Sequence, residues 1–224
     1  MNEHEITVEG GTSVLLPTAG TYCDKNIVIT ATGGSSDENQ LDARLQGTLK
    51  ELSSTIPSVT QYACYGLASL VKVNLPNATT LGAQAFRACT KLTSFNAPNV
   101  TSITTYAFYT CSGLPAINLP LVSSIPNNSF EICSKLAKAD FGAAASIGTN
   151  AFGRCTVLTA LILRKSDSIT TLANTNAFTS TPIASGTGYI YVPKTLIDSY
   201  KTAANWSTYA AQFRAIEDYP DICG

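Results

Sequence analysis

Side chains of the same kind recur every 22 residues through the middle of this sequence. Phenylalanine, cysteine and leucine each form such a series, and a fourth series holds valine, leucine or isoleucine. The series are Phe86, Phe108, Phe130 and Phe152; Cys89, Cys111, Cys133 and Cys155; Leu92, Leu114, Leu136 and Leu158; and Val59, Leu81, Ile103, Ile125, Ile147 and Ile169. A fixed period of this length indicates a solenoid, in which each repeat is one coil that buries its apolar face against its neighbours.

Each repeat divides into a strand and a return segment. Residues 114–120 alternate apolar and polar side chains after the leucine, which is typical of a short strand. Pro120 ends that strand where its missing N–H does no harm. The return segment, such as residues 103–111, spaces its apolar residues three to five apart, which favours a helical turn or a 3₁₀ helix. Stacked coils would then form a parallel ladder with strands about 4.8 Å apart.

Two runs, residues 75–89 and 101–111, carry an Ala-Phe…Cys…Leu motif that resembles the BspA-type leucine-rich repeats of bacterial surface proteins. The similarity covers about residues 56–217, and the tail from 189 to 207 resembles the segment that closes these proteins. The resemblance implies a right-handed α/β solenoid with 22-residue turns, a parallel β-sheet on the concave face and short helical or 3₁₀ turns opposite. It also implies adhesion to host or matrix proteins at a cell or virion surface, with no catalytic residues to transfer.

The ends of the chain differ in pattern from the repeats. Two runs near the N-terminus alternate apolar and polar residues between glycine turn signals, which predicts a small, separate β element. Near the C-terminus, a strand and helical segments carry aromatic residues that would cover the open end of the coil. We therefore divide the chain into a β element at 1–34, a linker and amphipathic capping helix at 35–55, leucine-rich repeats at 56–188 and a C-terminal cap at 189–224.

Four leucines form one stripe at helical spacing in the segment before the repeats: Leu41, Leu45, Leu49 and Leu52. We expect a helix that packs this stripe on the first repeat. The alternative is a homo-oligomer formed through the same stripe. Gly47 weakens that alternative, because a glycine inside a helix costs about 1 kcal/mol relative to alanine.

Composition and motifs exclude several classes of function. The formal net charge is −1 and the basic residues are scattered, so we expect no nucleic-acid partner. No stretch of about 18 apolar residues occurs, so we expect no membrane insertion, and the N-terminus lacks the pattern of a secretory signal. The single histidine, His4, is far in sequence from every repeat, which leaves no base for a Ser–His–Asp or Cys–His site. Without a C-x-x-C pair or a phosphate-binding glycine loop, we expect no catalytic residues, metal or cofactor.

The sequence contains seven cysteines, four of them in the cysteine series. We expect this series to be a buried ladder in which each thiol acts as a small apolar filler. Disulfides are not expected there, because each cysteine has two equivalent neighbours and no preferred partner. Cys64 falls in the phenylalanine series and should also be core, whereas nothing fixes the state of Cys23 and Cys223 near the termini.

The strand residues that face away from the core form the predicted partner surface, on the concave face. They are Lys72, Asn74, Ser94, Asn96, Ala116, Asn118, Lys138 and Asp140. Two interpretations of the asparagines stay open: a ladder of side-chain hydrogen bonds between coils, or a direct contact surface. The small side chains and the lack of aromatic or arginine anchors predict weak or avid binding.

Two functions are consistent with these patterns. The first is a non-catalytic protein-binding or adhesion module that recognises a host or matrix protein. The second is a structural component of a phage tail or fibre-like assembly that contacts another virion or envelope component, because residues 17–25 resemble segments near the start of phage structural proteins. A monomer favours the first function, and a stable oligomer held by the leucine stripe favours the second.

Overall fold

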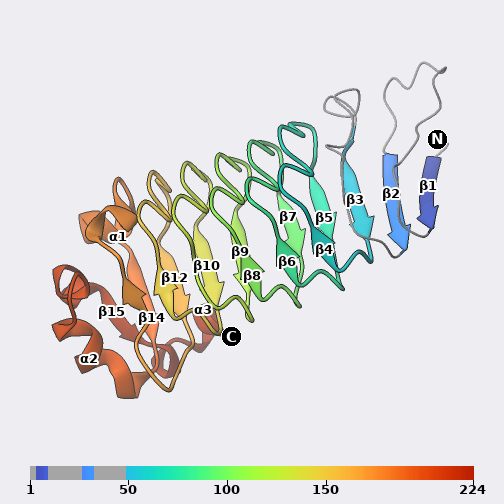
Figure 1. Ribbon diagram of the computed structural model, residues 1–224. Coiled ribbons are helices and arrows are strands. Elements are labelled where there is room, and N and C mark those ends of the chain that lie inside the picture. Colours follow the sequence, from blue (N-terminus) through green and yellow to red (C-terminus); the bar gives the residue numbers. More distant parts are fainter. Residues whose placement is uncertain (1–3, 10–26, 33–48) are drawn as a thin grey trace.

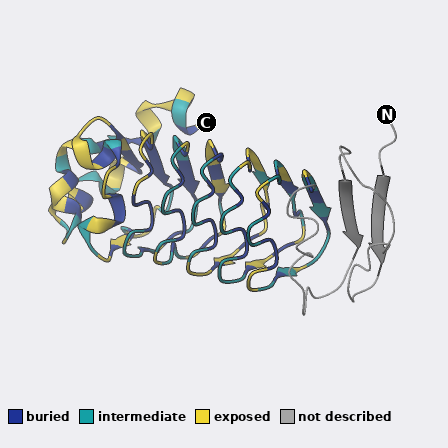
Figure 2. Cartoon of the chain, turned by 90° about the horizontal axis from the view of Figure 1, so that it is seen from above, coloured by how far each residue is buried: buried dark blue, intermediate teal, exposed yellow. Residues whose placement is uncertain are grey.

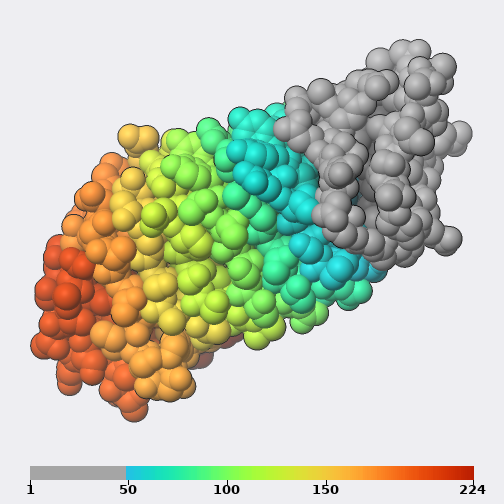
Figure 3. All heavy atoms as spheres, viewed as in Figure 1, coloured from blue at the N-terminus to red at the C-terminus, as the bar shows by residue number. Residues whose placement is uncertain are grey.

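The computed structural model describes residues 4–9, 27–32 and 49–224. Successive repeats form the coils of an elongated stack, with one row of strands along one face (Figure 1). Sequence order is also spatial order along this stack (Figure 3). The arrangement is the parallel-stranded repeat architecture that the periodicity predicts.

The longer row of strands defines a surface that we call the strand face. It consists of two parallel sheets, in the orders β1-β2-β3-β5-β7 and β9-β10-β12-β14-β15. The strands are β1 (His4–Glu9), β2 (Ile27–Thr32), β3 (Glu51–Ser54), β5 (Lys72–Asn74), β7 (Ser94–Asn96), β9 (Ala116–Leu119), β10 (Lys138–Phe141), β12 (Ala160–Leu163), β14 (Tyr189–Val192) and β15 (Phe213–Ala215). Val73 pairs with Phe95, and Ala139 pairs with Leu161, so equivalent positions of neighbouring repeats lie side by side.

A second row of two-residue strands follows the first around each coil. It consists of β4 (Ser58–Val59), β6 (Thr80–Leu81), β8 (Ser102–Ile103), β11 (Ser146–Ile147) and β13 (Thr171–Leu172). An isolated bridge joins Ile125 to Ile147 in the same row. The predicted series ended at Ile169, but Ile147 pairs with Leu172 instead. The extra residues of this repeat therefore come before the aligned position, in the loop after β12, and Ile169 is only half-buried.

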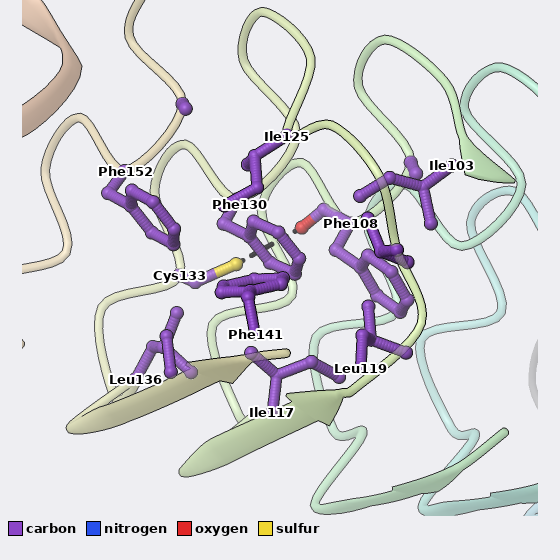
Figure 4. Packing of buried hydrophobic residues seen from close by; sticks show 14 of the residues in the cluster. Ile103, Phe108, Ile117, Leu119, Ile125, Phe130, Cys133, Leu136, Phe141 and Phe152 are labelled. Carbon is purple, nitrogen blue, oxygen red and sulfur yellow. Dashed lines mark hydrogen bonds between the residues drawn. The ribbon is translucent and has the colours of Figure 1, made fainter. Parts of the chain in front are cut away.

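The phenylalanine series forms a continuous stack inside the coil (Figure 4). Centroids of neighbouring rings from Phe86 to Phe178 are 5.2–5.8 Å apart, and their planes lie within 11° of parallel. All of these rings are fully buried, as the interior of the coil generally is (Figure 2). Each buried ring contributes about 1.5–3 kcal/mol. The predicted phenylalanine column is confirmed.

The cysteine series lies in the same core, and its thiols also act as hydrogen-bond donors. Cys111 Sγ donates to the carbonyl oxygen of Phe86 at 3.0 Å, and Cys133 Sγ donates to that of Phe108 at 3.1 Å (Figure 4). The six cysteines in the described part of the chain, Cys64 and Cys223 included, are buried free thiols. Burial raises the pKa of Cys89 to about 12. The buried ladder is therefore confirmed, and the thiols additionally bond carbonyl groups of the preceding coil.

The return segments are chains of tight turns, so the prediction of helical or 3₁₀ turns is wrong for most coils. Two residues of each segment have a left-handed backbone; in one coil these are Gln84 (φ 58°) and Ala88 (φ 63°). A left-handed residue interrupts a right-handed helix. The intervening N–H groups alternate in direction: Ala85 donates within its own turn to Gly82, whereas Phe86 donates to Ala107 of the next coil at 2.8 Å. Hydrogen bonds between coils thus replace those within a helix.

The two N-terminal strands continue the parallel sheet of the repeats. Ile6 pairs with Ile29, and Ile29 pairs in turn with Leu52 of β3. We predicted a separate β element here, and the pairing with β3 corrects this, because an exposed edge of β3 is a template for further strands. Cys23 and the phage-like segment 17–25 lie outside the described residues. The domain limits at 34, 55 and 188 stay predictions.

The predicted capping helix does not extend over the end of its segment, since Glu51–Ser54 form β3. Pairing with strands on both sides overrides the local helical spacing of the leucines. Leu49 and Leu52 are buried in the core, so neither is accessible to a second chain. Leu41 and Leu45 lie outside the described residues.

The C-terminal cap covers the last coil with short helices. They are η2 (Thr175–Phe178) and α1 (Pro182–Ser185) in the last repeat, then η3 (Lys194–Leu196), α2 (Ile197–Thr202), η4 (Trp206–Gln212), η5 (Ile216–Asp218) and α3 (Pro220–Cys223). The indole N–H of Trp206 donates to the carbonyl oxygen of Thr170 at 2.6 Å, and its ring lies 6.0 Å from Phe178. Tyr200 is likewise buried there. The predicted aromatic cover is confirmed, and α3 then turns back beside the strand face (Figure 1).

Candidate binding surface

Half of the strand face, over β5, β7 and β9, is open to solvent. Alternation along each strand turns one side chain inward and the next outward. In β9, Ile117 and Leu119 are buried, while Ala116 and Asn118 are exposed. Lys72 begins β5 and lies 3.8 Å from the carboxylate of Glu51, a solvated ion pair that contributes at most about 1 kcal/mol. Six of the eight predicted site residues share this open half: Lys72, Asn74, Ser94, Asn96, Ala116 and Asn118.

The asparagines of this half form part of the expected ladder. Asn96 Nδ2 donates to Asn74 Oδ1 at 2.7 Å, and Asn74 Nδ2 donates to Ser53 Oγ at 3.3 Å. These bonds support the interpretation that the side chains satisfy one another between coils. The ladder ends at the next coil, because no hydrogen bond within the described residues joins Asn118 to Asn96. Asn118 therefore belongs to a different environment.

The sheet is interrupted between β7 and β9, which do not pair. In the coils on either side, Thr93 donates its backbone N–H to Val71 and Ala137 donates to Pro115, each at 2.8 Å. Pro115 occupies the same position in the intervening coil and has no N–H to donate. Proline thus removes the bond that would begin this pairing.

A cleft of about 750 Å³ lies over this interruption. Phe95 and Ile117 contribute apolar surface, and Phe95 is only half-buried although it occupies a core position. Its ring packs edge-on against Phe86 and Phe108, at 5.1 and 4.9 Å between centroids. Asn118 and Ser94 supply polar groups at the rim. The cleft can therefore accept an apolar side chain and bond a polar one beside it.

The other half of the strand face, over β10, β12 and β14, is covered by the C-terminal segment. Arg164 forms a bidentate pair with Asp140, with nitrogen–oxygen distances of 2.8 and 2.7 Å, and also donates to the carbonyl of Cys223. Lys138 Nζ donates to the carbonyl oxygen of Ile222 at 2.5 Å. Lys138 and Asp140 were predicted partner residues, and the structure corrects this, because both are already engaged by the chain itself.

Apolar contacts reinforce this cover. Cys223 of α3 is buried in a small cluster with Ala160, Ile162 and Tyr191, which would otherwise face solvent. Burial raises the pKa of the Cys223 thiol. The hydrogen bonds to Asp140 raise the pKa of the Arg164 guanidinium, which stays charged. Sequence reasoning overlooked both Arg164 and Cys223; the apolar Ile162 among polar outward positions was the one available signal that something covers this half.

The described residues were also searched for other kinds of site. They contain no group of three or more histidine, cysteine, aspartate or glutamate side chains placed to hold a metal ion. None of the described helices has the length and apolar character needed to cross a membrane.

Comparisons with known proteins place the repeats in context. The chain matches the family model described as a BspA type leucine rich repeat region, in six copies, over residues 52–185. No curated protein matches it.

Among solved structures, the chain is similar to a leucine rich cell surface protein from Faecalibacterium prausnitzii, with 23% identity and a TM-score of 0.46 over 74% of this chain and 49% of that one. It is similar to a leucine-rich repeat protein from Bacteroides ovatus, with 25% identity and a TM-score of 0.48 over 62% and 37%. A leucine rich repeat protein from T. pallidum matches with 23% identity and a TM-score of 0.37 over 75% and 58%. The chain thus spans less than two thirds of each of these proteins.

Proposed function

Because this chain belongs to the family of BspA-type leucine-rich-repeat proteins, we propose that it is a non-catalytic module for protein binding or adhesion at a cell surface. Its partner in this proposal is a host or matrix protein. The binding surface is the open half of the strand face, made of Lys72, Asn74, Ser94, Asn96, Ala116 and Asn118.

The observation that carries the proposal is the division of the strand face. On the open half, Ser94, Asn96 and Ala116 are exposed over adjacent coils, and the cleft beside Phe95 breaks the flat strip. An interface needs an apolar centre with a polar rim, and the half-buried Phe95 beside Asn118 offers both. Over the other half, the chain's own C-terminal segment fills the equivalent space. A protein partner therefore has one accessible region on this face.

The proposal includes the finer geometry of the coil. We take each turn to be 22 residues long and the winding to be right-handed, because connections between parallel strands of one sheet are almost always right-handed. The strand face is then the concave surface. The regular pairing of positions such as Lys72 with Ser94 supports the turn length.

The test introduces bulk and charge into the open half. Ala116→Arg projects from an exposed strand position beside the cleft and should abolish capture of proteins from a host-cell surface extract. The matched control is Val157→Arg, which adds the same side chain at an exposed position outside the strands. Capture by the control should equal that of the wild type.

A photo-reactive side chain at Ser94 identifies the contact directly. We expect cross-links from Ser94 and none from the same group placed at Thr156, an exposed position outside the strands. Equal capture by Ala116→Arg and wild type, or cross-links from Thr156 alone, would remove the binding site from the strand face.

The second candidate, a structural component of a phage tail or fibre-like assembly, requires a stable oligomer. The burial of Leu49 and Leu52 leaves only Leu41 and Leu45 of the proposed stripe to form it. Light scattering of the full chain separates the two candidates: a monomer supports the adhesion module, and a stable trimer supports the assembly component.

A further inference from the structure

A cluster of tyrosines surrounds one arginine on the return segments, away from the strand face. Its members come from three consecutive coils and occupy the same two positions in each. They are Tyr62 and Tyr65, then Gln84 and Arg87, then Tyr106 and Tyr109. We call this set the tyrosine patch.

Contacts within the patch hold its side chains in place. The Arg87 guanidinium lies 4.9 Å from the ring centroid of Tyr109, 5.6 Å from that of Tyr65 and 5.8 Å from that of Tyr106. Gln84 accepts a hydrogen bond from Arg87 at 2.6 Å and donates one to the Tyr62 hydroxyl at 2.9 Å. Because these groups are already ordered, a ligand that binds them loses little side-chain entropy on their account.

The charge of Arg87 is not balanced within the patch. No carboxylate pairs with it among the described residues, and the nearest acidic position of the same series, Glu131, pairs with Arg154 at 3.7 Å. Tyr62 is 36% exposed, and the other rings are half-buried, so ring surface remains open beside the guanidinium. Tyrosine and arginine together are the residues that most often anchor protein interfaces. A ligand suited to this surface carries a carboxylate and groups that pack on aromatic rings.

The spacing of the tyrosines selects a particular backbone. Neighbouring coils are about 4.8 Å apart, so the two tyrosine pairs, two coils apart, are separated by about 9.6 Å. A polyproline II helix repeats every three residues, or about 9.3 Å. Residues i and i+3 of such a helix, lying along the coil axis, would meet the first and the second tyrosine pair. Aromatic-lined surfaces recognise proline-rich segments in this manner.

We propose that the tyrosine patch binds a proline-rich, acidic segment in the polyproline II conformation. Prolines three apart pack on the pairs Tyr62–Tyr65 and Tyr106–Tyr109. A glutamate or aspartate between them pairs with Arg87, which stays stacked on Tyr109. This surface is independent of the strand face.

The probe is a fluorescent peptide of repeated Pro-Pro-Glu, titrated against the full chain by anisotropy. We expect saturable binding that weakens as salt increases, because an ion pair with Arg87 is screened. Peptides of repeated Pro-Pro-Lys and of repeated Gly-Ser-Glu, which change the charge and the backbone respectively, should not bind.

Variants from the repeat itself keep the fold. Tyr106→Asn places at a left-handed position the residue that Asn128 and Asn150 supply in later coils. Together with Arg87→Gln, it should weaken peptide binding about tenfold or more in each case. Tyr106→Phe keeps the ring and should retain binding. The controls Arg154→Gln and Tyr219→Asn remove the same groups elsewhere on the surface and should not change the affinity.

Several results would overturn the proposal: no saturable binding of Pro-Pro-Glu by the wild type, equal binding of Pro-Pro-Lys, or unchanged affinity in Arg87→Gln. Preference of the patch for a saccharide over every peptide in a matched titration would do the same. Ala116→Arg should leave peptide binding intact, which separates this site from the strand face. Circular dichroism of each variant establishes that the fold is kept.

Discussion

The interior of the coil and its strand face share one register but differ in how strictly their side chains repeat. Inside, Phe108 stacks on identical rings before and after it. Outside, the register passes from a bonded Asn74–Asn96 pair, across an unpaired gap, to Asp140 held by Arg164. Close packing leaves no freedom to vary a buried position, whereas solvent accepts most side chains. Stability therefore belongs to the interior, and individual character to the strand face.

The interior thiols give the largest effect expected from this difference. Burial raises the pKa of Cys64, Cys89, Cys111 and Cys133 above the ordinary 9.0. Above pH 9 the unfolded chain loses these protons and the folded chain keeps them, so the free energy of unfolding falls as pH rises. At pH 10 each thiol accounts for about 1.4 kcal/mol, or roughly 5 kcal/mol for all four.

Urea unfolding at pH 7 and pH 10 measures this loss. Cys111→Ala should reduce the difference between the two pH values by the share of one thiol. A stability that is the same at both pH values would mean that the cysteine series is not buried in solution.

Phe108→Ala tests the ring stack at its centre. The substitution leaves a cavity between two rings and should lower the free energy of unfolding by about 3–5 kcal/mol. Denaturant unfolding gives the value, and Phe108→Leu, which fills most of the space, should cost clearly less. A cost below about 1 kcal/mol would contradict a closely packed interior.

Arg164→Gln tests the covered half of the strand face. It leaves the Asp140 carboxylate, with 8% of its side chain exposed, without its cation. We expect a loss of about 1–2 kcal/mol, moderated by the partial exposure of Arg164. Lys194→Gln breaks the exposed pair with Asp218 and should cost less than about 0.5 kcal/mol. Equal costs, compared by thermal unfolding, would indicate that the two pairs are equally solvated.

Asn96→Ala should have the smallest effect on stability, about 0.5 kcal/mol or less, because its bond to Asn74 is exposed to water. Its effect on capture of a partner should be the larger one, since Asn96 lies in the centre of the open half. A loss above about 1.5 kcal/mol with unchanged capture would reverse the roles that we assign to interior and surface.

Apolar periodicity was sufficient to predict the interior. The phenylalanine and cysteine series and the aromatic cap were all predicted correctly, because a side chain that repeats at one interval has one place to be buried. The return segments were not, since left-handed backbone at Ala88 and Ile132 has no signal in residue type. β3 was predicted as helix because Leu49 and Leu52 fit helical spacing, and only the strands on either side decide otherwise.

The candidate surface was half predictable for a related reason. Alternation places Ser94 and Asn96 outward without knowledge of any other coil. The cover over Asp140 depends on Arg164 and Cys223, which are 59 residues apart in sequence and meet only in the fold. The gap beside β9 did have a signal: Pro115 stands where Thr93 and Ala137 donate their N–H groups, and comparing those positions would have revealed it.

The division of the strand face is the central claim, and the relative acetylation rates of two lysines test it most directly. In the free wild-type protein, Lys72, whose side chain is 56% exposed, should react quickly, and Lys138, bonded to the Ile222 carbonyl, should react slowly. Cys223→Arg, which displaces α3, should make Lys138 react as quickly as Lys72. Equal rates in the wild type would contradict the account, because the C-terminal segment would then leave the whole strand face open.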